Sequence, residues 1–170
     1  MTPPFSIPVL GFAAASGTGK TTLMEAVIRQ LHQGGLRVAA IKHGHHPADP
    51  DLPGKDTYRF RQAGAATVLF ASRERWFLIQ ELHDQEEPTL QEQVRMLHHH
   101  DLVLVEGYKN EQHPKIVVHR AAVGETLLHQ ELSNVVAVAS DDPHWDPGLP
   151  RFALDDAAAL ASFIRTLFGL

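Results

Sequence analysis

Gly11-Phe12-Ala13-Ala14-Ala15-Ser16-Gly17-Thr18-Gly19-Lys20-Thr21-Thr22 is the stretch of sequence that decides the fold. It follows an apolar run at residues 7–10, which is typical of a buried strand. It precedes apolar residues that recur at the spacing of one helix face, namely Leu23, Ala26, Val27 and Leu31. A strand, a glycine-rich turn and a helix in this order are the context of a P-loop.

The turn carries the groups that phosphate binding needs. Gly17 and Gly19 allow backbone N–H groups to point inward, beside the positive end of the following helix. Lys20 supplies a point charge for the terminal phosphates, and the Thr21 hydroxyl is suited to ligate Mg²⁺. We therefore expect a nucleotide to bind at Ser16, Gly17, Thr18, Gly19, Lys20, Thr21 and Thr22, with Lys20 also acting in catalysis.

One position departs from the pattern G-x-x-x-x-G-K-[ST], because Ala14 replaces its first glycine. Alanine is the smallest possible change, and Gly17 remains inside the loop. The alternative is a glycine-rich turn that binds nothing. Lys20 argues against it, since a lysine at a helix start opposes the helix dipole unless an anion lies there.

Composition bounds the possible functions. A chain of 170 residues predicts one domain, and 44% hydrophobic with 21% charged residues is typical of a globular protein. The net charge of −5 argues against general nucleic-acid binding, and the lack of cysteine excludes disulfides and thiolate metal sites. Neither a signal peptide nor an apolar run of membrane-spanning length is apparent. We expect a cytoplasmic protein that binds neither nucleic acid nor membranes.

Alternating patterns predict an α/β fold. Residues 36–42 form a second strand after a helix that ends at Gly34-Gly35, which implies a right-handed parallel unit. Further strands are predicted near residues 102–106, 115–119 and 134–140, with a last helix capped by Asp155. Residues 66–72 and 76–80 predict a hairpin, between helices at 56–63 and from Pro88. The whole chain, residues 1–170, is predicted to be a single P-loop NTPase-like domain, with a mostly parallel sheet flanked by helices in three α/β/α layers.

A loop at residues 42–59 follows the second strand at the edge where phosphates are expected. It contains carboxylates suited to water or metal, and cations suited to phosphate. We expect Asp51 or Asp56 to position water for catalysis. Nucleotide contacts are expected from His43, His45, His46, Lys55 and Arg59. A solvated surface loop is the alternative.

The histidines also raise the possibility of a transition-metal site. One group is formed by His43, His45 and His46, and the other by His98-His99-His100. Neither group has the spacing of a known zinc site, and no cysteine is available to complete one. Hydrogen bonding to phosphate or to a partner is equally compatible with these residues.

Two later strand ends carry candidate site residues. Glu106 ends a fully apolar strand, where P-loop proteins place an acid that holds Mg²⁺ or its water, and Gly107 allows close backbone approach there. Lys109 is expected to face the same pocket. Either Asp141 or Asp142, which follow the strand near 134–140, is suited to accept from a base edge, although a turn-forming aspartate before Pro143 is the alternative.

Three segments together resemble the MobB family of molybdopterin-guanine dinucleotide biosynthesis adaptors. They are the P-loop from Ala14 to Thr22, the loop with Lys42-His43-Gly44-His45-His46 and Pro53-Gly54-Lys55-Asp56-Thr57-Tyr58-Arg59, and Leu104-Val105-Glu106-Gly107-Tyr108-Lys109. Val136-Ala137-Val138-Ala139-Ser140-Asp141 also fits, so the resemblance covers nearly the whole chain. Ala14, Gly44 and Thr57 are its departures, and none of them removes a charged group.

This resemblance implies a homodimeric P-loop protein that binds GTP and Mg²⁺ and is at most a weak GTPase. It implies association with the guanylyltransferase that attaches GMP to molybdopterin, and with molybdopterin or recipient molybdoenzymes. Residues Gly17 to Thr22 then bind phosphate, and Thr21 with Glu106 forms the Mg²⁺ shell. Residues 43–59 form the second wall of the site.

Two other functions remain open. A small-molecule kinase would need an acceptor pocket and usually a mobile basic lid. A metal-delivery GTPase chaperone would use the two histidine clusters. Since neither an arginine finger nor a strong base is evident, slow turnover is expected unless a partner completes the site.

Overall fold

A computed structural model describes residues 5–44, 48–123 and 128–170. The chain divides into two compact units, Met1–His43 with Leu90–Leu170, and Gly44–Thr89. That residues 1–170 act as one nucleotide-binding domain stays a prediction.

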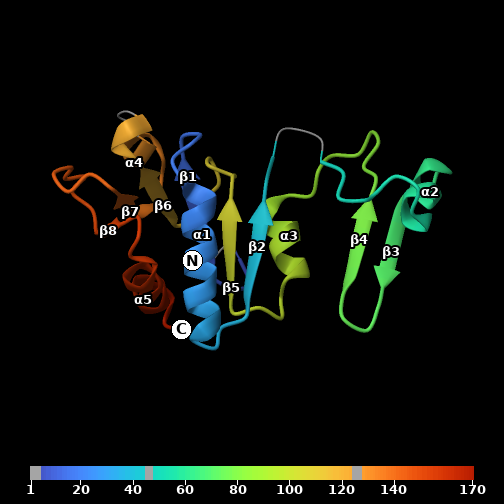
Figure 1. Ribbon diagram of the computed structural model, residues 1–170, viewed down its shortest axis with the longest axis horizontal. Coiled ribbons are helices and arrows are strands. Elements are labelled where there is room, and N and C mark those ends of the chain that lie inside the picture. The colour runs from blue at the N-terminus through green and yellow to red at the C-terminus, as the bar shows by residue number, and fades with distance from the viewer. Residues whose placement is uncertain (1–4, 45–47, 124–127) are drawn as a thin grey trace. The chain divides into compact units, whose positions relative to one another are not determined.

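The larger unit is built on a six-stranded sheet with the order β2-β5-β1-β6-β7-β8 (Figure 1). Its strands are β1 (Val9–Ala14), β2 (Val38–Lys42), β5 (Leu102–Glu106), β6 (Lys115–His119), β7 (Val135–Ser140) and β8 (Arg151–Ala153). All five pairings between neighbouring strands are parallel. The prediction of a mostly parallel α/β sheet is confirmed.

Helices cover both faces of this sheet. On one face, α1 (Lys20–Gln33) and α5 (Ala157–Phe168) lie side by side (Figure 1) and pack on residues such as Leu10 and Leu104. On the other face, α3 (Leu90–Met96) packs on Val103 and Val105. Adjacent residues of β5 thus enter opposite cores, as expected for a strand buried on both faces. The predicted three layers are confirmed.

A few element boundaries differ from the sequence-based predictions. The cap of α5 is Asp156, whose carboxylate accepts from the N–H of Ala159, and not Asp155. Strand β8 and the short elements η1 (Ala121–Val123) and α4 (Leu128–Glu131) were not predicted. Each has only three or four residues, which is too short for a periodic pattern to stand out.

The smaller unit contains α2 (Asp56–Gln62) and an antiparallel hairpin of β3 (Thr67–Ala71) and β4 (Trp76–Gln80). The hairpin and the helix are confirmed predictions. Three large apolar side chains lie on one face of the hairpin and are 49–68% exposed, and together they are called the hairpin face: Leu69, Trp76 and Leu78. Phe70 and Phe77 are paired on the opposite face, where their rings stack.

Arg61 contacts three carboxylates of the smaller unit. Its guanidinium lies 2.7 Å from Asp49, 3.4 Å from Asp51 and 2.5 Å from Glu81. Its side chain is only 7% exposed, so these contacts are largely shielded from water. The hydrogen bond from Arg61 lowers the pKa of Asp49 below its usual range.

A buried histidine lies before β6 in the larger unit. His113 is fully buried, and a side chain on Gly11 would collide with its ring, since a Cβ there would lie 2.4 Å from Nε2. Neither ring nitrogen has a hydrogen-bond partner among the described residues. Burial, reinforced by the charge of Lys115, lowers the pKa of His113 from 6.5 to about 4. The ring is therefore neutral in the folded protein near pH 7.

This pKa predicts a pH-dependent stability. The folded-state pKa is lowered, so the unfolded chain binds the proton first. The contribution of His113 is full above pH 6.5 and is lost as the pH falls toward 4. Relative to pH 7.5, about 2 kcal/mol should be lost at pH 5 through this group. Urea unfolding of the wild type and His113→Leu at both pH values isolates the effect. An equal loss of unfolding free energy in both proteins would contradict it.

Candidate functional site

The turn between β1 and α1 has the backbone conformation that its glycines predict. Gly17 and Gly19 have φ values of +80° and +86°, in the left-handed region that favours glycine. The Thr18 hydroxyl donates to the carbonyl of Ala15 at 3.1 Å, and Thr18 is only 1% exposed. Gly19 is the N-cap residue of α1, so the turn leads directly into the helix.

The start of α1 presents backbone donors and a positive dipole end. In the part of the chain that the structure describes, no side chain caps this end and no acidic residue lies in its first turn. The first intrahelical hydrogen bond is donated by the N–H of Leu23 to the carbonyl of Gly19. The N–H groups of Lys20, Thr21 and Thr22 precede it and have no intrahelical acceptor. Such an end is suited to an anion.

The parallel pairing of β5 with β1 and β2 brings the carboxylate of Glu106 to the start of α1. Phe12 of β1 and Lys42 of β2 are both in register with Glu106, the last residue of β5. Glu106 Oε1 lies 3.2 Å from Lys20 Nζ and 3.8 Å from Lys42 Nζ. Its side chain is 16% exposed. A lysine of the turn and the strand-end acid are therefore direct neighbours.

The donor set at this edge fits Mg²⁺ in its chemistry. Carboxylate and hydroxyl oxygens are the ligands that this hard cation prefers, and Glu106 and Thr21 supply one of each. Thr21 is solvent-exposed on the first turn of α1. Their role as metal ligands stays a prediction.

Gly107 allows the end of β5 to approach His43 closely. Its φ is +106°, and a Cβ there would lie 2.8 Å from the Cβ of His43. The His43 N–H donates to the Glu106 carbonyl at 2.8 Å, and its ring stacks on Tyr108 with centroids 4.3 Å apart. The predicted close approach at Gly107 is confirmed, and His43 is held at the same sheet edge as Glu106.

Most of the loop residues predicted for the site belong to the smaller unit. Asp51, Lys55, Asp56 and Arg59 belong to the smaller unit, and His45 and His46 lie outside the described residues. Asp51 is buried and accepts from the Thr57 hydroxyl at 2.9 Å. Asp56 and Arg59 are exposed and form an ion pair at 3.6 Å, and Lys109 of the larger unit is also exposed. The roles of these residues in binding or catalysis stay predictions.

Arg120 is a site residue that sequence reasoning missed. It follows β6, and its Nε donates to the carbonyl of Thr18 in the turn at 3.0 Å. Its Nη1 lies 3.4 Å from the carboxylate of Asp141, which also accepts from the N–H of Ala121 at 2.8 Å. No motif marks Arg120. The available signal was its place directly after a buried strand, at the edge where ligands bind.

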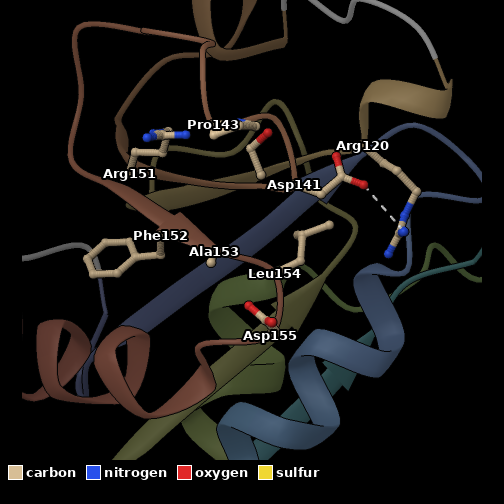
Figure 2. Close-up of a pocket in the computed structure, with 9 residues that line it drawn as sticks. Arg120, Asp141, Pro143, Arg151, Phe152, Ala153, Leu154 and Asp155 are labelled. Carbon is tan, nitrogen blue, oxygen red and sulfur yellow. Dashed lines mark hydrogen bonds and ion pairs between the residues drawn. The ribbon is translucent and has the colours of Figure 1, made fainter.

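A cavity of about 570 Å³ lies beside Arg120 in the larger unit (Figure 2). It opens at the carboxyl ends of β7 and β8, where Ser140 is in register with Ala153. Its lining residues are Arg120, Ser140, Asp141, Pro143, Arg151, Phe152, Ala153, Leu154 and Asp155.

The histidines do not form a metal centre within residues 5–44, 48–123 and 128–170. There, no group of three or more histidine or carboxylate side chains is placed to hold a metal ion. His98 and His99 have ring centroids 3.8 Å apart, and His98 Nδ1 contacts the carbonyl of Arg95.

None of the helices described is both long and apolar enough to traverse a lipid bilayer.

Comparison with known proteins assigns the family. The sequence model described as "Molybdopterin guanine dinucleotide synthesis protein B" (MobB) matches residues 9–141. The molybdopterin-guanine dinucleotide biosynthesis adapter protein of Escherichia coli is 45% identical over 164 residues, which are 93% of this chain and 91% of that protein. The adapter protein of Haemophilus influenzae is 40% identical over 81% of this chain and 76% of its own length. The chain belongs to the MobB family.

Solved MobB structures share the fold. A crystal structure of molybdopterin-guanine biosynthesis protein B superposes with a TM-score of 0.76 at 28% identity, and the match covers 94% of this chain and 99% of that one. The MobB homologue from Bacillus stearothermophilus gives a TM-score of 0.66 at 28% identity, over 93% and 98% of the two chains. The resemblance to MobB predicted from three sequence segments is confirmed.

The contact between Gly107 and His43 predicts a costly substitution. Gly107→Ala should lower the free energy of unfolding by about 2–4 kcal/mol, since both a strained φ and an overpacked contact result. Gly35→Ala is the matched control, because Gly35 has a φ of +88° and open space around it. Urea unfolding measures both variants. Equal losses would show that the approach of His43 imposes no constraint.

Proposed function

We propose that this MobB-family protein is an adapter in molybdopterin-guanine dinucleotide biosynthesis that binds GTP with Mg²⁺. The observation that carries the proposal is the pairing of Lys20 with Glu106 at the open N-terminus of α1. A turn of two left-handed glycines, a lysine and a strand-end acid in this arrangement is suited to hold nucleotide phosphates.

Each group at the site has a defined part in this proposal. The N–H groups of residues 17–22 and the ammonium of Lys20 neutralise phosphate charge. Thr21 and Glu106 would hold Mg²⁺, which screens the phosphate oxygens when it is bound. Lys42, at 3.8 Å from Glu106, keeps that carboxylate paired when Lys20 turns to a phosphate.

We expect hydrolysis by the isolated protein to be weak. Arg120 is engaged by the Thr18 carbonyl and by Asp141, and Asp51 is engaged by Thr57 and Arg61. Contacts within the protein therefore already occupy both side chains. A partner that completes the site would raise the rate.

The partners that we propose are those that the resemblance to the MobB family implies. An adapter in this biosynthesis would meet the guanylyltransferase that joins GMP to molybdopterin, and then molybdopterin or a recipient molybdoenzyme. The cytoplasm, where GTP is available, is the compartment that this role requires.

Homodimerisation is part of the proposal and is supported by the hairpin face. Isolated exposed apolar residues are common, but a contiguous group of large ones marks an interaction surface. Trp76 is 68% exposed and Leu78 is 49% exposed. Both lie on β4, at one edge of a two-stranded sheet.

Nucleotide titration tests the proposed binding. Isothermal titration with GTP–Mg²⁺ and ATP–Mg²⁺ should show preference for GTP. Lys20→Ala should weaken GTP binding at least tenfold, because it removes the charge that meets the phosphates. The control Arg95→Ala removes an exposed cation from α3, to which no role at the site is assigned. Preference for ATP would favour the small-molecule kinase, and labelled nucleotide would then show phosphate on an acceptor rather than on water.

Light scattering coupled to gel filtration tests the dimer. Trp76→Glu should convert a dimer to a monomer, because it places a charge on the hairpin face. Met96→Glu is the control, since Met96 is 70% exposed and belongs to α3 of the other unit. A wild-type monomer, or an unchanged Trp76→Glu dimer, would contradict this interface.

A further inference from the structure

We infer that the cavity at the carboxyl ends of β7 and β8 holds the nucleoside part of the bound nucleotide, and that Asp155 selects guanine there. This inference rests on the proposed nucleotide binding and adds the residue that determines base specificity. It differs from the expectation drawn from sequence, in which Asp141 or Asp142 accepts from the base edge.

The cavity lies beside the proposed phosphate-binding turn, and the side chain of Arg120 contacts both. Arg120 lines the cavity, and its Nε donates to the carbonyl of Thr18. Thr18 directly precedes Gly19 and Lys20 in the turn. A Cβ on Gly19 would lie 3.1 Å from a terminal nitrogen of Arg120. A nucleotide whose phosphates lie against residues 17–22 therefore has the cavity beside it for its ribose and base. This is the edge of a parallel sheet at which ligands bind.

The lining suits a flat, polar-edged ring. Figure 2 shows Ala153 and Leu154 between Asp141 and Asp155, so apolar surface separates the two carboxylates. Arg120 and Arg151 supply cations on the same lining. The volume of about 570 Å³ lies within the range of about 300–1,000 Å³ that small-molecule sites occupy.

Several polar groups of the lining are already engaged. Asp141 accepts from Ala121 N–H and pairs with Arg120. The Ser140 hydroxyl accepts from the N–H of Asp142 and contacts His119 Nδ1 at 2.9 Å. Arg151 donates to the Asp142 carbonyl at 2.6 Å. These bonds position the wall of the cavity rather than leaving its atoms available to a base.

Asp155 is the carboxylate that remains available. Among the described residues it makes no hydrogen bond or ion pair, and its neighbour Asp156 caps α5. Guanine presents two adjacent donors on its Watson–Crick edge, N1–H and the N2 amino group, which a carboxylate can accept together. Adenine presents the N1 lone pair at that position, which repels a carboxylate. Asp155 therefore favours GTP over ATP.

Exchange of the acceptor for an amide tests this assignment. Asp155→Asn should weaken GTP–Mg²⁺ binding about ten- to hundredfold, the usual value of one paired base edge. It should strengthen binding of xanthosine triphosphate relative to GTP, because xanthine has a carbonyl where guanine has the N2 amino group. Binding of inorganic tripolyphosphate should stay as in the wild type. Asp156→Asn is the matched control, since it makes the same change one residue away and asparagine also caps helices.

The outcomes separate this inference from the proposed function. In one outcome the wild type binds both tripolyphosphate and GTP, and Asp155→Asn binds GTP as tightly as the control Asp156→Asn does. The assignment of Asp155 is then overturned, while the phosphate site stands. If only Asp141→Asn turns preference toward xanthosine triphosphate, Asp141 reads the base and the assignment is again overturned. If wild type binds neither tripolyphosphate nor GTP, the proposed function fails as well. Thermal unfolding by circular dichroism confirms that each variant is folded.

Discussion

The site depends on the parallel pairing of β1 with its two neighbours. Strands that run in one direction end at one edge, so the turn after β1, the acid that ends β5 and the arginine that follows β6 arrive together. The register Phe12↔Glu106 sets the height at which the carboxylate meets Lys20. A shift of one residue would turn Glu106 to the other face of the sheet and separate the two charges.

Charge at this edge is arranged in complementary pairs. Glu106 lies between Lys20 and Lys42, and Asp141 holds Arg120 against the Thr18 carbonyl. Each acid thereby orients a cation near the start of α1, where the helix dipole favours an anion. Binding of a triphosphate would exchange the contact of Lys20 with Glu106 for contacts with phosphate. The proposed Mg²⁺ would give Glu106 a new partner in that exchange.

Local patterns predicted most of the fold, and long-range contacts account for what they missed. Apolar runs in the sequence predicted β1, β2, β5, β6 and β7. The glycine-rich turn predicted the place of Lys20, because phosphate binding by a P-loop depends on residues that are contiguous in the sequence. Arg120 was missed because its partner Thr18 lies 102 residues away. The pairing of Asp51 with Arg61 was also missed, because it depends on the folding of the smaller unit, and the predicted role of Asp51 in positioning water stays a prediction. The burial of His113 could not be predicted either, since β1, which approaches its ring at Gly11, lies far away in the sequence.

A crystal structure with a non-hydrolysable GTP analogue and Mg²⁺ would show whether the turn after β1 binds the phosphates. We expect phosphate oxygens within hydrogen-bond distance of the N–H groups of residues 17–22, with Lys20 Nζ moved from Glu106 to a phosphate. We also expect Mg²⁺ to be held by Thr21 and Glu106. Phosphates bound elsewhere, with the 3.2 Å contact of Lys20 and Glu106 intact, would overturn the proposed binding site.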